Sequence, residues 1–280
     1  MRVLVTGAAG QLGTDLVRTC RAAGDEVVAC SRAELDLTDR DSVLAAVTSV
    51  GPDVVFNAGA WTAVDACESD PDRAFRTNAM SVRWVTQAAR LTGSHVLHVS
   101  TDYVFDGTKP EPYHEWDDPS PRSVYGQSKL GGEREVDPSH TIVRTSWVCG
   151  AHGSNMVKTV LSLLDRPELA FVDDQRGCPS FTADLAPAMR RLAVARMPGT
   201  FHVTNQGATT WYGFVRDVLE AAGADPDKVR PIATADLDPP RAAPRPANSV
   251  LDNAALRHAG LPLLPHYREP LDRLVRELQS

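Results

Sequence analysis

Short runs of apolar and β-branched residues recur along the first half of the chain, separated by longer stretches of mixed polarity. Such runs predict buried strands, because a strand that is covered on both faces carries apolar residues without strict alternation. The predicted strands are Arg2–Thr6, Glu26–Ser31, Asp53–Asn57, His95–Ser100 and Thr141–Trp147. Stretches between them, such as Thr14–Ala23 and Arg73–Thr92, are predicted to be helices. This alternation indicates an α/β fold with a doubly wound, Rossmann-type parallel sheet.

The pattern loosens after Val148. Predicted helices at Asn155–Leu164, Ala183–Ala195 and Tyr212–Ala222 alternate with shorter strands such as Thr200–Val203. We therefore expect a Rossmann domain over residues 1–148 and a smaller C-terminal α/β domain over residues 149–280. Some segments of the second part are expected to return to the Rossmann sheet.

A glycine-rich turn follows the first strand directly and leads into a helix. A strand, a glycine turn and a helix together form the context of a dinucleotide-binding fingerprint. Gly7 and Gly10 let the backbone approach a pyrophosphate, and Gly13 lets the helix pack closely on the strand. The N–H groups that open the helix, around Gln11 and Leu12, face the anion. The spacing is G-x-x-G-x-x-G, and a tight turn without a ligand is the alternative.

The end of the second strand bears on the type of dinucleotide. NAD sites usually carry an acid there, which binds the ribose 2′-hydroxyl. Here Ser31 and Arg32 offer a hydroxyl and a guanidinium, which suit a 2′-phosphate. We expect NADPH, with NADH as the alternative if Arg32 is simply solvated. Asp36 and Leu37 are assigned to the same cofactor site, although Asp36 could instead serve only as a cap.

Small residues follow the third strand, and a hydroxyl follows the fourth. Ala58, Gly59 and Ala60 leave room for a ligand in the crevice beyond the carboxyl end of their strand. Thr101 reaches the same edge of the sheet, where its hydroxyl could polarise a carbonyl oxygen.

Tyr125 and Lys129 lie four residues apart, which places them on one face of a helix. In water a phenol ionises near pH ~10 and an ammonium near ~10.4. A neighbouring ammonium favours the phenolate, so we expect Lys129 to lower the pKa of Tyr125 into a range useful for proton transfer. On its own this spacing also fits a plain surface helix.

The composition excludes several classes of function. A net charge of −7 argues against nucleic acid or an anionic membrane as the main partner. No apolar run approaches the ~20 residues that a membrane span requires, and the chain enters a strand pattern without a signal peptide. The 5 cysteines are scattered, without a C-x-x-C pair, so we expect reduced thiols and a cytoplasmic protein.

Taken together, these motifs resemble the extended short-chain dehydrogenases/reductases, and more closely the dTDP-4-dehydrorhamnose reductases, which make dTDP-L-rhamnose. The resemblance covers essentially the whole chain. The matching segments are Gly7–Gly13, Asn57–Ala60, Ser100–Gly107, Tyr125–Lys129, Arg144–Trp147, Asp174–Pro179, Thr210–Tyr212 and Arg245–Ser249.

The resemblance implies a role for each residue of the catalytic group. Tyr125 would donate a proton to a ketone, Lys129 would bind the nicotinamide ribose, and Thr101 would be the third catalytic residue. Asp102 and Trp147 would contact the dTDP-sugar. Residues 1–148 would then bind NAD(P), and residues 149–280 would mainly bind substrate.

Two features leave alternatives open. The proline-rich segment Pro231–Pro246 is either a surface loop or a cover that places the Arg245 guanidinium on a substrate phosphate. Some members of this family are Mg²⁺-linked homodimers, but no acids can be assigned to that role here. A metal and a dimer therefore both stay open.

Rival activities on the same scaffold are weaker candidates. A 4,6-dehydratase would need a second carboxylate after Thr101, where Asp102 is followed by Tyr103. A 4-epimerase retains NAD and prefers an acid at the end of the second strand. Reductases of other dTDP-4-keto-6-deoxysugars share these motifs, and sequence alone does not separate them. A non-catalytic subunit resembling the methionine adenosyltransferase β subunit keeps this fold as a binding module, but the intact Thr101, Tyr125 and Lys129 weigh against it.

Overall fold

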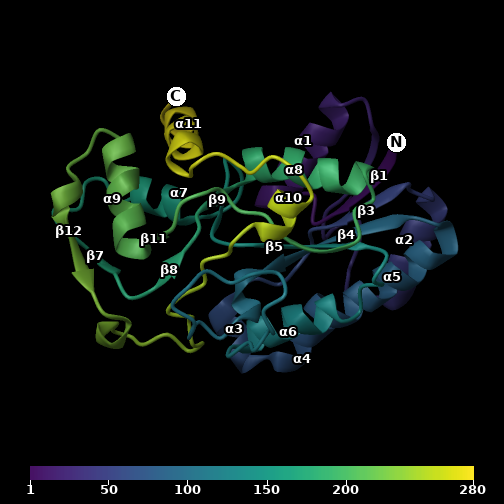
Figure 1. Ribbon diagram of the computed structural model, residues 1–280, viewed down its shortest axis with the longest axis horizontal. Helices are drawn as coiled ribbons and strands as arrows, with labels where there is room; N and C mark the ends of the chain where they lie inside the picture. Colours follow the sequence, from purple (N-terminus) through teal and green to yellow (C-terminus); the bar gives the residue numbers. More distant parts are fainter.

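The computed structural model describes residues 1–280 and contains a six-stranded parallel sheet (Figure 1). The strands run in the order β10-β5-β4-β3-β1-β2, and every neighbouring pair is parallel. The predicted doubly wound parallel sheet is thereby confirmed. The strands are β1 (Arg2–Thr6), β2 (Glu26–Cys30), β3 (Val54–Asn57), β4 (His95–Thr101), β5 (Thr141–Thr145) and β10 (Gly199–His202).

Helices cover both faces of this sheet. On one face α1 (Gln11–Ala22) packs beside α8 (Thr182–Val194), and on the other α2 (Arg40–Val50) packs beside α5 (Ser81–Thr92). Figure 1 shows the two pairs on opposite sides of the strands. Successive side chains of a strand point to opposite faces of the sheet, so the strands contribute residues to one hydrophobic core on each face.

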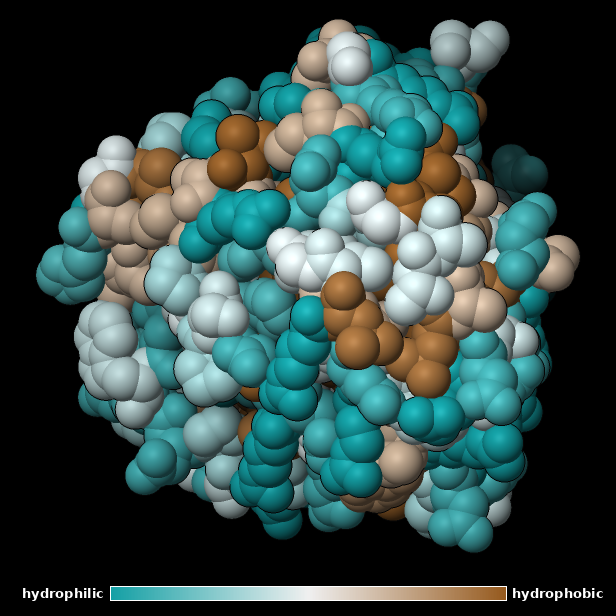
Figure 2. All heavy atoms as spheres, turned by 90° about the vertical axis from the view of Figure 1, so that its right-hand side faces the viewer, coloured by the Kyte–Doolittle hydropathy of each residue, from teal (hydrophilic) through white to brown (hydrophobic).

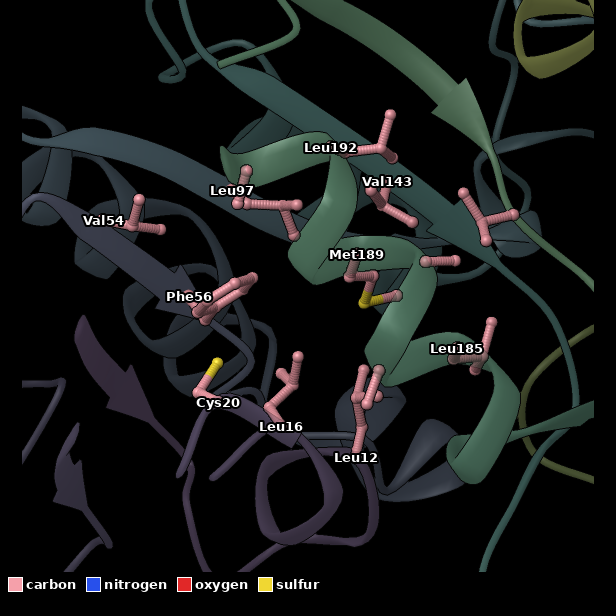
Figure 3. Packing of buried hydrophobic residues seen from close by; sticks show 14 of the residues in the cluster. Leu12, Leu16, Cys20, Val54, Phe56, Leu97, Val143, Leu185, Met189 and Leu192 are labelled. Carbon is pink, nitrogen blue, oxygen red and sulfur yellow. The ribbon is translucent and has the colours of Figure 1, made fainter. Parts of the chain in front are cut away.

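The core on the α1 and α8 face is the larger of the two. Leu185, Met189 and Leu192 of α8 point toward the sheet, where Phe56 and Leu97 lie (Figure 3). All five side chains are fully or almost fully buried. Each contributes about 1.5–3 kcal/mol when removed from water, so α8 is held firmly to the sheet although it belongs to the second half of the chain.

The predicted helix Arg73–Thr92 is interrupted. The chain forms α4 (Pro71–Phe75), a π-helical segment at Arg76–Met80, and then α5. The wider π turn lets the Asn78 side chain leave the helix, where its Nδ2 donates to the Trp61 carbonyl at 3.0 Å and to Ser128 Oγ at 3.0 Å. The interruption thus ties the segment after β3 to the helix that carries Tyr125.

The predicted strand Thr141–Trp147 ends two residues early, at Thr145. Trp147 has a φ of 44°, which is left-handed backbone and cannot continue a strand. The chain therefore leaves the sheet after Thr145, and Trp147 does not continue the alternation of side chains along β5.

A second core lies at the opposite end of the molecule from α2 (Figure 1). It is formed by helices and a pair of parallel strands, namely α7 (Met156–Leu161), α9 (Trp211–Ala221), α11 (Arg268–Gln279), β7 (Leu169–Val172) and β12 (Val229–Ile232). The remaining elements are α3 (Val64–Ser69), α6 (Val124–Glu133), α10 (Ala254–His258), β6 (Val148–Cys149), β8 (Arg176–Gly177), β9 (Ser180–Phe181) and β11 (Thr209–Thr210), with 3₁₀ turns at Asp102–Val104, Pro226–Lys228 and Thr234–Asp236.

The sheet order reverses at β1, which lies between β2 and β3. In doubly wound sheets ligands bind beyond the carboxyl ends of the strands at such a switch point. The glycine turn after β1 and the small residues after β3 therefore meet where a ligand is expected.

Figure 2 shows the end of the molecule near α2 and α5, where several small apolar groups lie among polar side chains. None of the helices combines the length and the apolar composition needed to cross a bilayer.

Candidate active site

The glycine turn brings two strand ends into backbone contact. Gly7 has a φ of 65°, and a Cβ on it would lie 2.7 Å from the Gly59 Cα. A Cβ on Gly13 would lie 2.1 Å from the Gly7 carbonyl oxygen. No side chain caps α1 at Gly10, so the N–H groups of its first turn have no protein acceptor. This end of α1 is therefore suited to bind an anion such as a pyrophosphate.

A cavity of about 640 Å³ opens at this edge of the sheet. It is lined by every residue predicted to bind the cofactor, namely Gly7, Gly10, Gln11, Leu12, Gly13, Arg32, Asp36, Leu37, Ala58, Gly59, Ala60, Tyr125 and Lys129. Thr101, Asp102 and Trp147 line the same cavity. The glycine turn and the Tyr125 group therefore face one space.

The end of β2 carries an acid that sequence reasoning missed. Glu34 accepts hydrogen bonds through Oε2 from the Ser31 backbone N–H, at 2.8 Å, and from the Ser31 hydroxyl. These bonds hold the pKa of Glu34 below its usual range. Ser31 is thus hydrogen-bonded to a carboxylate, while Arg32 lines the cavity. Asp36 accepts from the N–H and hydroxyl of Thr38, both at 2.8 Å, and closes a local turn.

Tyr125 is buried against Thr101 and Tyr103. Burial raises the pKa of Tyr125, while a hydrogen bond with the Thr101 side chain acts in the opposite direction. The expected lowering of this pKa by Lys129 is wrong, because removal of the phenol from water outweighs any such effect. A raised pKa keeps the phenol protonated near neutral pH, which is the state that a proton donor needs.

Lys129 is buried in the floor of the cavity. Its Nζ donates to the Val99 carbonyl oxygen at 2.7 Å. Burial lowers the pKa of Lys129 to about 8, and the nearby Glu133 carboxylate acts in the opposite direction. Glu133 is itself held by Arg144, with Nη2 to Oε2 at 2.7 Å, and by the Ser100 hydroxyl at 2.5 Å. Lys129 therefore lies near the buried ion pair of Glu133 and Arg144.

Asp102 lies beneath Thr101 and is only 2% exposed. Its Oδ1 accepts from the Thr101 hydroxyl and its Oδ2 from the Ser146 hydroxyl, both at 2.9 Å. Burial raises the pKa of this carboxyl group, although its hydroxyl partners oppose that shift. These bonds fix the direction of the Thr101 hydroxyl, and a contact of Asp102 with the sugar stays a prediction.

Two indoles form the wall of the cavity that lies toward the second core. Trp147 stacks on Trp211 with ring centroids 3.6 Å apart and an angle of 6° between the planes. A Cβ on Gly177 would lie 2.4 Å from the Trp147 ring, so only glycine fits behind it. The matching motif Thr210–Tyr212 pointed to this region, but Trp211 itself was not predicted as a site residue.

Two further lining residues were missed. The Arg73 guanidinium lies over the Trp61 ring, with its carbon 4.3 Å from the ring centroid, and both residues face the cavity. The pair joins α4 to the segment after β3. Nothing in the local sequence distinguishes Arg73 from a solvated helix residue.

Arg245 does not line the cavity. Its guanidinium binds the Asp65 carboxylate in a bidentate pair, with Nη1 to Oδ1 at 2.6 Å and Nη2 to Oδ2 at 2.7 Å. The expected placement on a substrate phosphate is therefore not the arrangement found. No group of three or more His, Cys, Asp or Glu side chains is arranged to hold a metal ion.

Known proteins resemble this chain over its full length. The family model described as "RmlD substrate binding domain" matches residues 1–280. A dTDP-4-dehydrorhamnose reductase of Streptomyces griseus is 44% identical over 96% of this chain and 91% of its own length. A dTDP-4-keto-6-deoxy-D-glucose reductase of Streptomyces niveus is 39% identical over 96% of this chain and 95% of its own.

A solved structure agrees with these relatives. The dTDP-4-dehydrorhamnose reductase of Bacillus anthracis, in complex with NADP, superposes with a TM-score of 0.94 at 36% identity and covers 99% of both chains. The chain therefore belongs to the dTDP-4-dehydrorhamnose reductase family, as its motifs predicted.

Proposed function

We propose that this protein reduces the C4 ketone of dTDP-4-dehydro-L-rhamnose to dTDP-L-rhamnose, with NADPH as the reductant. The observation that carries this proposal is one cavity lined by the glycine turn together with Thr101, Tyr125 and Lys129. When bound, NADPH supplies the hydride, and the chain supplies binding, orientation and the proton.

The residues present fit a dinucleotide phosphate. The free N–H groups at the start of α1 would bind the pyrophosphate. Arg32 would bind the 2′-phosphate beside the turn that contains Asp36 and Leu37, and Lys129 would bind the nicotinamide ribose. The NADP complex of the Bacillus anthracis relative supports this assignment.

Tyr125 would give its phenolic proton to the ketone oxygen while the hydride adds to C4. Burial favours the protonated phenol, so the donor is loaded at neutral pH. Thr101, whose hydroxyl is directed by Asp102, would hold the phenol in position. The ketone becomes an alcohol, because C4 gains the hydride and the oxygen gains the proton.

The dTDP-sugar would occupy the side of the cavity that Trp147 and Trp211 close. Both indoles contact the second core, so residues 149–280 would supply much of the substrate half and residues 1–148 the cofactor half. The net charge and the site chemistry suit a small-molecule enzyme of the cytoplasm.

The test is loss of NADPH absorbance on addition of dTDP-4-dehydro-L-rhamnose. Tyr125→Phe should lower kcat by roughly 10²-fold or more, the usual scale for a general acid. Tyr212→Phe removes a phenol outside the cavity and should leave the rate unchanged. Turnover that survives Tyr125→Phe would refute the assignment of the acid.

A reductase of another dTDP-4-keto-6-deoxysugar is the second candidate. The Streptomyces niveus relative, named as acting on a keto-deoxyglucose, is almost as similar as the rhamnose enzyme. A panel of dTDP-4-keto-6-deoxysugars, with the product configuration at C4 read by NMR, separates the two. NADPH binding without turnover of any sugar would instead support a non-catalytic subunit.

A further inference from the structure

Arg245 of the proline-rich segment Pro231–Pro246 forms an ion pair with Asp65 of α3. Besides the bidentate pair with Arg245, Asp65 accepts the Ala243 backbone N–H at 3.0 Å. The hydrogen bonds of Arg245 hold the pKa of Asp65 down, at about 2. The Arg245 side chain is only 14% exposed, while the Asp65 side chain is 37% exposed, so the arginine is the shielded member of the pair. This arginine has a fixed partner and a fixed position.

The same guanidinium meets Tyr103, which is a neighbour of the proposed catalytic group. The guanidinium lies close enough to the Tyr103 phenol to oppose the rise in its pKa that burial causes, and Tyr103 packs on the buried cluster that contains Cys67 of α3 and Tyr125. The Tyr103 ring stands edge-on to the Tyr125 ring, with centroids 5.6 Å apart and an angle of 75° between the planes. The Tyr103 backbone N–H donates to Thr101 Oγ1 at 3.2 Å. Tyr103 thus contacts both Thr101 and Tyr125.

The helix α3 links this arrangement to α6 as well. Glu68 Oε1 accepts the Val124 backbone N–H at 2.8 Å, immediately before Tyr125. On α6 a Cβ on Gly126 would lie 2.2 Å from the Tyr103 carbonyl oxygen, so α6 rests directly on the Tyr103 backbone. One short helix therefore holds the proline-rich segment through Asp65 and the start of α6 through Glu68.

We propose that Asp65 and Arg245 form a latch that positions Tyr103, and through Tyr103 the Tyr125 phenol. The latch rests on the proposed function, because Tyr125 is the proton donor there. Arg245 is then a positioning residue that acts from behind the cavity wall. Tyr103 and Tyr125 come from different elements, and their rings meet edge to face. A misplacement of about 1 Å at a reacting group can cost on the order of 10² in rate.

The chain offers a matched control for the latch. Arg241 lies in the same segment and approaches the same Asp65 carboxylate at 4.0 Å, but its side chain is 59% exposed. Arg245→Gln should lower kcat on the order of 10-fold while the NADPH dissociation constant stays within about twofold. Arg241→Gln should change neither. Arg245→Lys, which keeps the charge but loses the bidentate geometry, should fall between Arg245→Gln and wild type.

A double-mutant cycle tests the pairing itself. If Arg245 acts through its pair with Asp65, Asp65→Asn combined with Arg245→Gln should be no slower than the worse single variant. An unchanged kcat in Arg245→Gln would overturn the latch. A raised KM for the dTDP-sugar with unchanged kcat would also overturn it, in favour of direct contact between Arg245 and substrate.

A second readout separates failure of the latch from failure of the proposed function. If wild type reduces none of the sugars, the function falls, and the latch is still tested by NMR of ring-labelled tyrosine. Arg245→Gln should then move the Tyr103 and Tyr125 resonances, and Arg241→Gln should move neither. Unmoved Tyr125 resonances in Arg245→Gln, in a folded protein, would overturn the latch whatever the activity.

Discussion

The Lys129 ammonium donates to the Val99 carbonyl oxygen at 2.7 Å, and burial raises the pKa of Tyr125 although the lysine lies one turn further along the same helix. The side chain crosses from α6 to β4 and ends in the floor of the cavity. Its charge is therefore placed for a ligand above β4 more than for the phenol beside it. In the proposed function Lys129 binds the nicotinamide ribose, so its protonation state should affect the affinity for NADPH.

NADPH binding should weaken as pH rises through about 8. Burial lowers the pKa of Lys129 to about 8 from an ordinary value of 10.5, so the ammonium is present below that pH and lost above it. The measurement is the NADPH dissociation constant of the enzyme without substrate, taken on both sides of this pH. Lys129→Met should remove the pH dependence. A dissociation constant that stays flat in wild type would contradict the assignment of the lysine.

The buried ion pair beneath Lys129 should be important for stability. Glu133 and Arg144 are each only 5% exposed, and Glu133→Gln would leave the guanidinium buried without its partner charge. We expect a loss of about 3–5 kcal/mol in the free energy of unfolding, measured by urea denaturation.

A surface ion pair provides the control for that measurement. Arg83 makes a bidentate pair with Glu135 but is 54% exposed, so Arg83→Gln should destabilise the protein far less. Similar losses for the two variants would show that burial does not set the strength of these pairs.

The sequence allowed the glycine-turn side of the cavity to be predicted almost completely. Gly7 and Gly13 act through the absence of a side chain, and that requirement is visible in the residue type and its spacing. The face shared by Tyr125 and Lys129 follows in the same way from helical periodicity. Local rules are sufficient where the function depends on local backbone geometry.

Long-range pairings could not be predicted in this way. Arg245 binds Asp65 across most of the chain, and no local pattern shows that its guanidinium is already occupied. The pKa of Tyr125 likewise depends on burial among residues from several elements. Trp147 carries a left-handed backbone that is unusual for its residue type, so the early end of its strand was missed.

Gly126→Ala should destabilise the protein, although alanine is normally the better helix former by about 1 kcal/mol. A Cβ at this position would lie 2.2 Å from the Tyr103 carbonyl oxygen, and backbone cannot move aside cheaply. Gly131→Ala on the same helix is the control, because its Cβ would meet the Ala79 methyl at 3.2 Å. Thermal unfolding of both variants checks this. Equal melting temperatures would mean that α6 can shift away from Tyr103.

Cofactor preference should respond in opposite directions to two neighbouring charges at the end of β2. Arg32→Ala removes the cation that would meet a 2′-phosphate, so KM should rise for NADPH and change little for NADH. Glu34→Gln removes a carboxylate that is hydrogen-bonded to Ser31, the neighbour of Arg32. Because that negative charge would repel a 2′-phosphate, KM for NADPH should fall. The ratio of kcat/KM for the two cofactors, measured for wild type and both variants, decides the matter. If Arg32→Ala leaves that ratio unchanged, Arg32 does not bind the 2′-phosphate and does not explain a preference for NADPH.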